Sequence, residues 1–162
     1  MSKKRRLAFA ATAVAALGTV VVLVLSAGGR EPIYEGKPLD VWFLGYRSPD
    51  PEDRKRAVEV THQSGTNAIP TLLRMLRAHD SPLKRKVMGF VQRHSAYRIS
   101  YISAGIRNCA AANACEELDD KAKVAVPALI ALLTREDSSV RSAASNALKR
   151  IDPKAAANAG VE

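Results

Sequence analysis

Along most of this chain, apolar residues recur every three or four positions, which is the spacing of an amphipathic helix. Outside the N-terminal end, alanine and leucine outnumber the β-branched residues, which favours helices over strands. The predicted fold class is therefore all-α. The pattern predicts helices near residues 38–45, 52–64, 67–78, 82–95, 103–118, 122–134 and 138–151.

A different pattern occurs at the N-terminal end, where residues 7–27 contain no charged side chain. As a helix this run would be about 30 Å long, enough to cross the apolar core of a bilayer. Basic residues precede it, from Lys3 to Arg6, and few follow. The positive-inside tendency therefore predicts one transmembrane helix, with a cytoplasmic N-terminus and residues 30–162 exported. The alternative is a cleaved signal peptide, which would make the protein secreted, because small residues at 26–28 lie near a cleavage point.

The short stretch after this segment carries an apolar stripe. Leu39, Trp42, Phe43 and Tyr46 are spaced at i, i+3, i+4 and i+7, so they share one helix face. We interpret this helix as a cap over one end of the helical stack. The alternative places Trp42 and Tyr46 at the membrane interface or against a partner.

The chain also contains an internal repeat with an offset of 57 residues. Residues 68–76 align with residues 125–133, which places Pro70 over Pro127. Each copy predicts a helix, a short turn and a second helix with proline in its first turn. Proline is tolerated there because the first amide groups of a helix have no partner within it.

The second copy carries a family resemblance. Residues 126–133 follow the pattern Val-Pro-x-Leu-Ile-x-Leu-Leu, and residues 137–151 follow Asp-x-x-Val-Arg-x-x-Ala-x-x-Ala-Leu-x-x-Ile. Residues 122–152 thus resemble a HEAT repeat of the bacterial phycobilin-lyase-like kind, and residues 52–94 match less closely. The resemblance implies a short α-solenoid of helical pairs that makes protein–protein contacts. It also leaves an alternative, lyase-like activity on, or binding of, a chromophore or other small molecule.

The repeat divides the chain into three predicted parts. The offset of 57 residues exceeds the usual HEAT period of about 40–47 residues, and residues 96–102 form the extra loop. After Ile151 no convincing second helix is predicted, which leaves an open end available for self-association. The predicted parts are a basic tail with an anchor or signal peptide at 1–29, a linker and capping helix at 30–51, and HEAT-like repeats at 52–162.

No catalytic or metal-binding motif stands out. The three histidines do not form a His-Glu-x-x-His motif, and the chain lacks a nucleophile elbow and a phosphate loop. Cys109 and Cys115 lie six residues apart, about 9 Å along one helix, whereas bridged Cα atoms lie within about 7 Å. Two buried thiols are therefore expected; the alternative, a disulfide, requires a helix break near 112–113. We expect no cofactor, metal or catalytic residue, and a binding or scaffolding module in place of an enzyme.

The formal net charge of +9 is concentrated in the first half of the predicted repeats. Residues 47–107 contain twelve Lys or Arg against five Asp or Glu. A cationic face of this kind can contact nucleic-acid phosphates, but an exported domain lies away from the chromosome. We therefore predict a protein partner. The predicted partner-binding surface consists of Arg54, Arg74, Arg77, Lys84, Arg85, Arg98 and Tyr101.

Overall fold

The computed structural model describes residues 31–81, 86 and 102–161, and Pro32–Glu162 form one compact unit. The predicted anchor at 7–27 and the helix predicted near 82–95, apart from Lys86, lie outside these residues. Within the described ranges, no helix is both long and apolar enough to span a bilayer.

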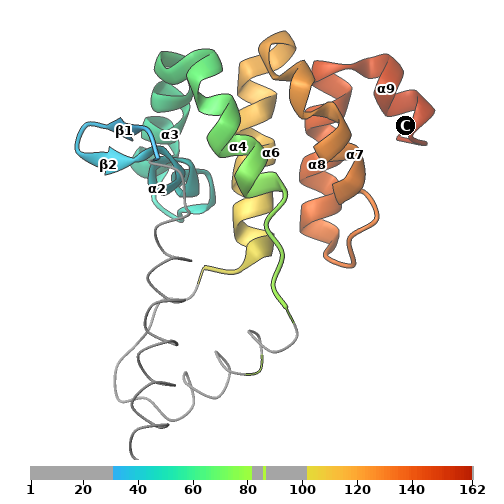
Figure 1. The fold of residues 1–162 in the computed structure, drawn as a ribbon, viewed down its shortest axis with the longest axis horizontal. Coiled ribbons are helices and arrows are strands. Elements are labelled where there is room, and N and C mark those ends of the chain that lie inside the picture. Colours follow the sequence, from blue (N-terminus) through green and yellow to red (C-terminus); the bar gives the residue numbers. More distant parts are fainter. Residues whose placement is uncertain (1–30, 82–85, 87–101, 162) are drawn as a thin grey trace, which may run out of the picture. The chain divides into compact units, whose positions relative to one another are not determined.

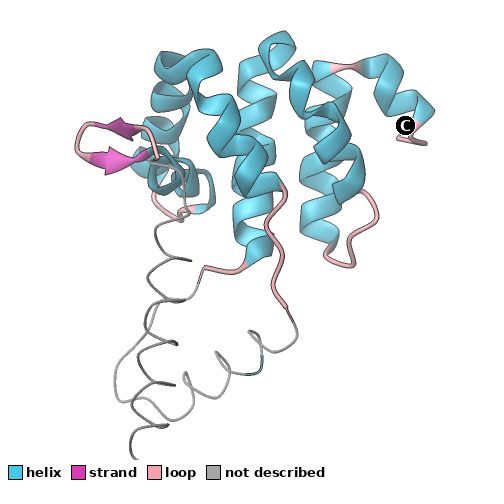
Figure 2. Cartoon of the chain, in the orientation of Figure 1, coloured by secondary structure: helices cyan, strands magenta, loops and turns pink. Residues whose placement is uncertain are grey.

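The described chain is mostly helical, which confirms the predicted all-α class (Figures 1 and 2). Three 3₁₀ segments lie between the α-helices: η1 (Leu44–Arg47), η2 (Gly65–Ala68) and η3 (Asp119–Ala125). The α-helices with both ends in the described ranges are α2 (Leu39–Phe43), α3 (Pro51–Ser64), α4 (Ile69–Leu76), α6 (Ala104–Leu118), α7 (Val126–Leu132), α8 (Ser138–Ile151) and α9 (Pro153–Asn158).

A small hairpin precedes α2. The sequence pattern did not predict this hairpin. Strands β1 (Ile33–Tyr34) and β2 (Lys37–Pro38) pair antiparallel around Glu35 and Gly36. Both turn residues have positive φ, 46° and 75°, as a type I′ hairpin turn requires. Glycine supplies this conformation without steric cost, whereas glutamate adopts it rarely, so a Glu-Gly turn is a weaker signal than Asn-Gly.

The apolar stripe after the hairpin faces the core, as predicted. Leu39 and Phe43 are fully buried, and α2 packs against α3 and α4. The Tyr46 hydroxyl donates a hydrogen bond to Thr61 Oγ1 at 2.9 Å, and burial raises the pKa of Tyr46 above its usual range. Tyr46 is therefore directed toward α3 and not toward a free surface.

The two predicted helix pairs have matching architecture. In the first pair α3 leads through η2 into α4, and in the second α6 leads through η3 into α7. Helix α4 begins at Ile69 and α7 at Val126, which preserves the offset of 57 residues, and each has proline in its first turn. The tight 3₁₀ turns explain why both helices begin later than the sequence pattern predicted.

Helix α6 lies at the centre of the packed unit. It contacts α3, α4 and α8, and α7 packs against α8 (Figure 1). Ala110, Ala111, Ala112 and Ala114 on α6 are completely buried. Small side chains let neighbouring helices approach α6 from several sides at once. The core therefore surrounds α6, and α3, α4, α7 and α8 all contribute buried side chains to it.

The C-terminal end differs from the prediction. Where no second helix was expected, α9 follows α8 after Asp152, whose carboxylate accepts a hydrogen bond from the Ala155 amide at 2.9 Å. Helix α9 packs on α8 and buries Ala156. Alanine-rich residues with an Asp-Pro start form a short helix here because the tertiary contact with α8 supports it. The last helix pair is therefore complete.

Candidate protein-binding face

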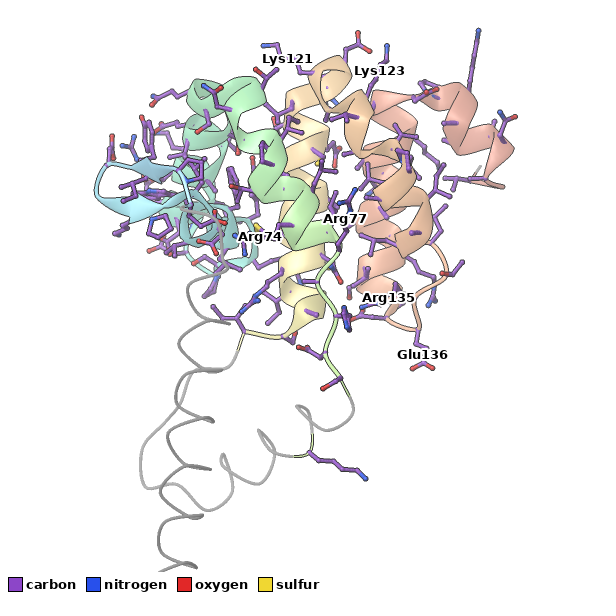
Figure 3. The ribbon with its side chains drawn as sticks, viewed as in Figure 1. Arg74, Arg77, Lys121, Lys123, Arg135 and Glu136 are labelled. Carbon is purple, nitrogen blue, oxygen red and sulfur yellow. The ribbon has the colours of Figure 1, made fainter. Side chains whose placement is uncertain are left out.

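Helix α4 has one buried and one exposed side. Its buried side consists of Thr71, Leu72, Met75 and Leu76. Arg74 and Arg77, one turn apart, project from the other side (Figure 3). Arg74 Nη2 lies 3.2 Å from Asp40 Oδ2, and the Arg74 side chain remains 47% exposed. A surface ion pair of this kind contributes less than about 1 kcal/mol to stability, so it tethers α2 to α4 only weakly.

Helix α7 presents a second exposed surface. Leu129 and Leu132 are buried, whereas Pro127, Ile130 and Ala131 are exposed. Ile130 is a large apolar side chain that remains 38% exposed. The exposed surface of α7 is thus mostly small and apolar, in contrast to the arginines of α4.

A groove of about 350 Å³ separates these two helices. We call it the α4–α7 groove. The charged residues that line it are Arg77, at the end of α4, and Arg135, just after α7. Arg135 Nη2 donates to the Ala78 carbonyl oxygen at 3.5 Å, which draws the end of α7 toward the end of α4. The other lining residues are Leu76, Ala78, Pro127, Ala128, Ala131 and Leu132.

A second groove, of about 470 Å³, begins at Arg135 and reaches the start of α6 and α8. It is mixed in charge, because Asp80, Glu136 and Asp137 line it together with Arg135. Two of these carboxylates hold helix starts: Asp80 Oδ2 accepts from the Ala104 amide at 2.6 Å, and Asp137 caps α8. Two carboxylates of this groove therefore already accept hydrogen bonds that stabilise the fold.

Asn108, which lines the second groove, holds the end of α4 in place. It is fully buried, and its Nδ2 donates to the carbonyl oxygens of Met75, Leu76 and Ala78 at 2.8, 2.9 and 3.2 Å. The last carbonyls of a helix lack partners within that helix. Asn108 supplies donors to them from α6 and so holds the end of α4 in place.

The predicted surface residues are only partly brought together. Arg74 and Arg77 share the face of α4, but Arg54 lies on α3, where its Nη1 donates to the Ser48 carbonyl at 2.6 Å. The sequence pattern did not indicate Arg135, because the C-terminal half of the chain is nearly neutral in charge. Four other predicted residues lie outside the described part of the chain: Lys84, Arg85, Arg98 and Tyr101.

The two cysteines are free and buried on one continuous helix, α6. This is the arrangement expected for two buried thiols, without the helix break that a disulfide between them would require. Burial raises the pKa of Cys115 to about 12 and also raises the pKa of Cys109. Neither cysteine lines the two grooves at Arg135, so these grooves give the small-molecule alternative no support.

His62 and His79, the histidines in the described ranges, lie apart from each other on the surface. His62 Nε2 lies 3.6 Å from Glu117 Oε2 on the surface, and His79 lines the mixed-charge groove. In the portion of the chain with described coordinates, no group of three or more His, Cys, Asp or Glu could hold a metal ion.

Trp42 lies in a cationic setting at the hairpin. Lys37 Nζ is 4.7 Å and the Arg56 guanidinium carbon 5.7 Å from the centre of its ring. Its indole nitrogen donates to the Tyr34 carbonyl at 2.8 Å. Arg56 also forms ion pairs with Glu35 and Glu59, which raise its pKa further. These contacts attach the hairpin to α3.

Comparisons with protein-family models, with curated proteins and with solved structures found no match to this chain.

Proposed function

We propose that this chain is a membrane-anchored HEAT-like module that binds a partner protein through the face formed by α4 and α7. The anchor follows from the uncharged run at residues 7–27 and the basic residues before it, so the partner lies on the exported side of the membrane. The module acts as a scaffold and carries out no reaction of its own.

The exposed sides of α4 and α7 support this proposal. Both helices bury leucines in the core, Leu72 and Leu76 on α4 and Leu129 and Leu132 on α7, and each keeps its opposite side exposed. Stacked helical pairs create extended surfaces that bind partners. The repeated pair, with its offset of 57 residues and its prolines at positions 70 and 127, fits a short α-solenoid of this kind.

The observation that carries the proposal is the α4–α7 groove. It combines apolar lining residues with two arginines at one end, and α7 also exposes the large apolar side chain of Ile130. Arginine is enriched at protein interfaces, and the fully buried centre of an interface is more apolar than the rest of the protein surface. Protein–protein binding uses such a surface without any further chemistry.

Affinity purification of the full chain from its native membranes tests the proposal. We expect one discrete protein to copurify with the wild-type chain and to be lost with the double variant Arg77→Glu/Ile130→Arg. The control Lys149→Glu/Arg150→Glu changes charge on the exposed side of α8 and should keep the partner. A partner that survives the first variant, or the absence of any specific partner, contradicts the proposal.

The same sample tests the anchor. Intact mass of the purified protein should include Lys3 to Arg6. A mature protein that begins after residue 26 would instead favour the secreted alternative.

A further inference from the structure

We infer that the α4–α7 groove accepts a short acidic segment of the partner protein. An apolar side chain of that segment lies in the groove, and the carboxylate of a neighbouring aspartate or glutamate binds between Arg77 and Arg135. This inference rests on the proposed function and adds the chemistry of the partner.

The charge of the groove favours an anion. Arg77 and Arg135 are its charged lining residues, and the nearby carboxylates of Asp80, Glu136 and Asp137 line the neighbouring groove instead. In the described part of the structure Arg77 is exposed and makes no ion pair, while the Arg135 side chain donates one hydrogen bond, to the Ala78 carbonyl. A guanidinium has five N–H donors, so both side chains retain donors that fit a carboxylate.

The size and lining of the groove favour a peptide side chain. Its volume of about 350 Å³ is near the lower limit of small-molecule pockets, which suits one or two side chains. Ala128 and Ala131 form part of its wall, and their methyl groups leave room that larger side chains would fill. An apolar residue next to an acidic one matches both the wall and the rim.

The two arginines of the groove belong to different elements of the fold. Arg77 caps the end of α4, and Arg135 follows α7, so two different elements supply the donors at one end of the groove. The Arg135–Ala78 hydrogen bond and the contact of Asn108 with the end of α4 hold these elements together. A single carboxylate can therefore meet an anion site that is already assembled, which lowers the entropic cost of binding.

Fluorescence anisotropy with three synthetic probes tests the inference on the full chain in detergent micelles. The probes are short fluorescein-labelled peptides of leucine, alanine and glutamate, and versions with glutamine or lysine in place of glutamate. We expect saturable binding of the glutamate peptide, binding about ten-fold weaker for the glutamine peptide, and none for the lysine peptide. Failure of the glutamate peptide to saturate, or equal binding of the glutamine peptide, overturns the inference.

Variants locate the binding. Arg77→Glu/Arg135→Glu should abolish binding of the glutamate peptide, and Ala131→Trp should abolish it by filling the groove without a change of charge. Lys149→Glu/Arg150→Glu makes the same charge change on α8 and should bind as the wild type does. Circular dichroism confirms that each variant is folded. Unchanged binding to Ala131→Trp, or an equal loss in the α8 control, also overturns the inference.

The peptide and purification experiments distinguish a failure of the acidic-segment inference from a failure of the proposed function. If the glutamate peptide does not bind but the native partner is still lost with Arg77→Glu/Ile130→Arg, the acidic segment is wrong and the protein-binding face stands. If no partner copurifies, the proposed function itself fails.

Discussion

Gly65 and Asp119 have the same backbone conformation at equivalent positions of the two helix pairs. Gly65 ends α3 with φ 52° and ψ −133°, and Asp119 ends α6 with φ 53° and ψ −133°. Both residues turn the chain into the 3₁₀ segment that leads to the second helix. The second connection is longer, because η3 runs from Asp119 to Ala125 whereas η2 runs from Gly65 to Ala68. The turn geometry is thus conserved between the pairs although the residue is not.

This relationship predicts opposite effects of two substitutions on stability. A side chain is disfavoured at positive φ, so Asp119→Gly should raise the free energy of unfolding by about 1 kcal/mol. Gly65→Ala should lower it by about 1–2 kcal/mol, and since nothing lies within 4 Å of an added Cβ there, the cost is conformational. Urea unfolding of the full chain in micelles, followed by circular dichroism, measures both. Asp119→Ala removes the charge without freeing the backbone and should give no gain; a gain equal to that of glycine would contradict this explanation.

A second prediction concerns Asn108, which donates hydrogen bonds to the end of α4. Asn108→Ala removes all three of these hydrogen bonds and should cost about 2 kcal/mol of unfolding free energy. Asn108→Asp places a carboxylate against the same carbonyls and should cost about 3 kcal/mol or more. The matched control is Asn113→Asp on the half-buried side of α6, which should change stability by well under half as much. Equal losses at the two positions would show that Asn108 has no special role.

The hairpin gives a local prediction, because Trp42 is the only tryptophan of the chain. Valine is strongly disfavoured at positive φ, so Gly36→Val should loosen the hairpin and the contact between the indole and the Tyr34 carbonyl. Fluorescence emission should shift to longer wavelength, and acrylamide quenching should increase. Gly160→Val introduces the same conflict at φ 75° near the C-terminus and should leave Trp42 emission unchanged. A shift in both variants would indicate global loosening instead.

The buried thiol of Cys115 predicts a loss of stability at alkaline pH. Its pKa is raised by burial from 9.0 to about 12, so the unfolded chain releases this proton at a lower pH than the folded chain. The stabilising contribution is therefore complete below about pH 9 and is lost as the pH rises toward 12. Urea unfolding over this range should show a smaller decline for Cys115→Ala than for the wild type. Identical slopes would mean that Cys115 ionises normally in the folded protein.

Much of the helical architecture could be predicted from the sequence because it depends on local signals. Helix spans follow from apolar spacing, and Pro70 and Pro127 mark the starts of α4 and α7 within a few residues. The turn between α6 and α7 has no comparable local signal. Asp119 ends α6 at positive φ, and Asp120 pairs with Lys123 at 2.7 Å, where the chain turns before α7 begins.

The candidate site was harder to predict because it depends on tertiary contacts. Asn108 is one polar residue on an alanine-rich helix, and only its contact with the end of α4 reveals its role. Arg135 joins Arg77 because the ends of α7 and α4 meet at the Ala78 carbonyl. The basic character of residues 47–107 predicted Arg54 as a surface residue of the site instead. Arg54 lies on α3, where it donates a hydrogen bond to the Ser48 carbonyl. Helix faces could be predicted, but the meeting of two helix ends could not.

In-cell photo-cross-linking tests directly whether α4 and α7 form the partner-binding surface. A photoreactive amino acid placed singly at Arg77, Ile130 or Ala131 samples the α4–α7 face, and one at Lys55 or Lys149 samples exposed positions of α3 and α8. We predict that all three positions on α4 and α7 cross-link the same partner protein, and that the α3 and α8 positions do not. Cross-links of equal strength from α3 and α8, or none from α4 and α7, would contradict a binding face on the second helices.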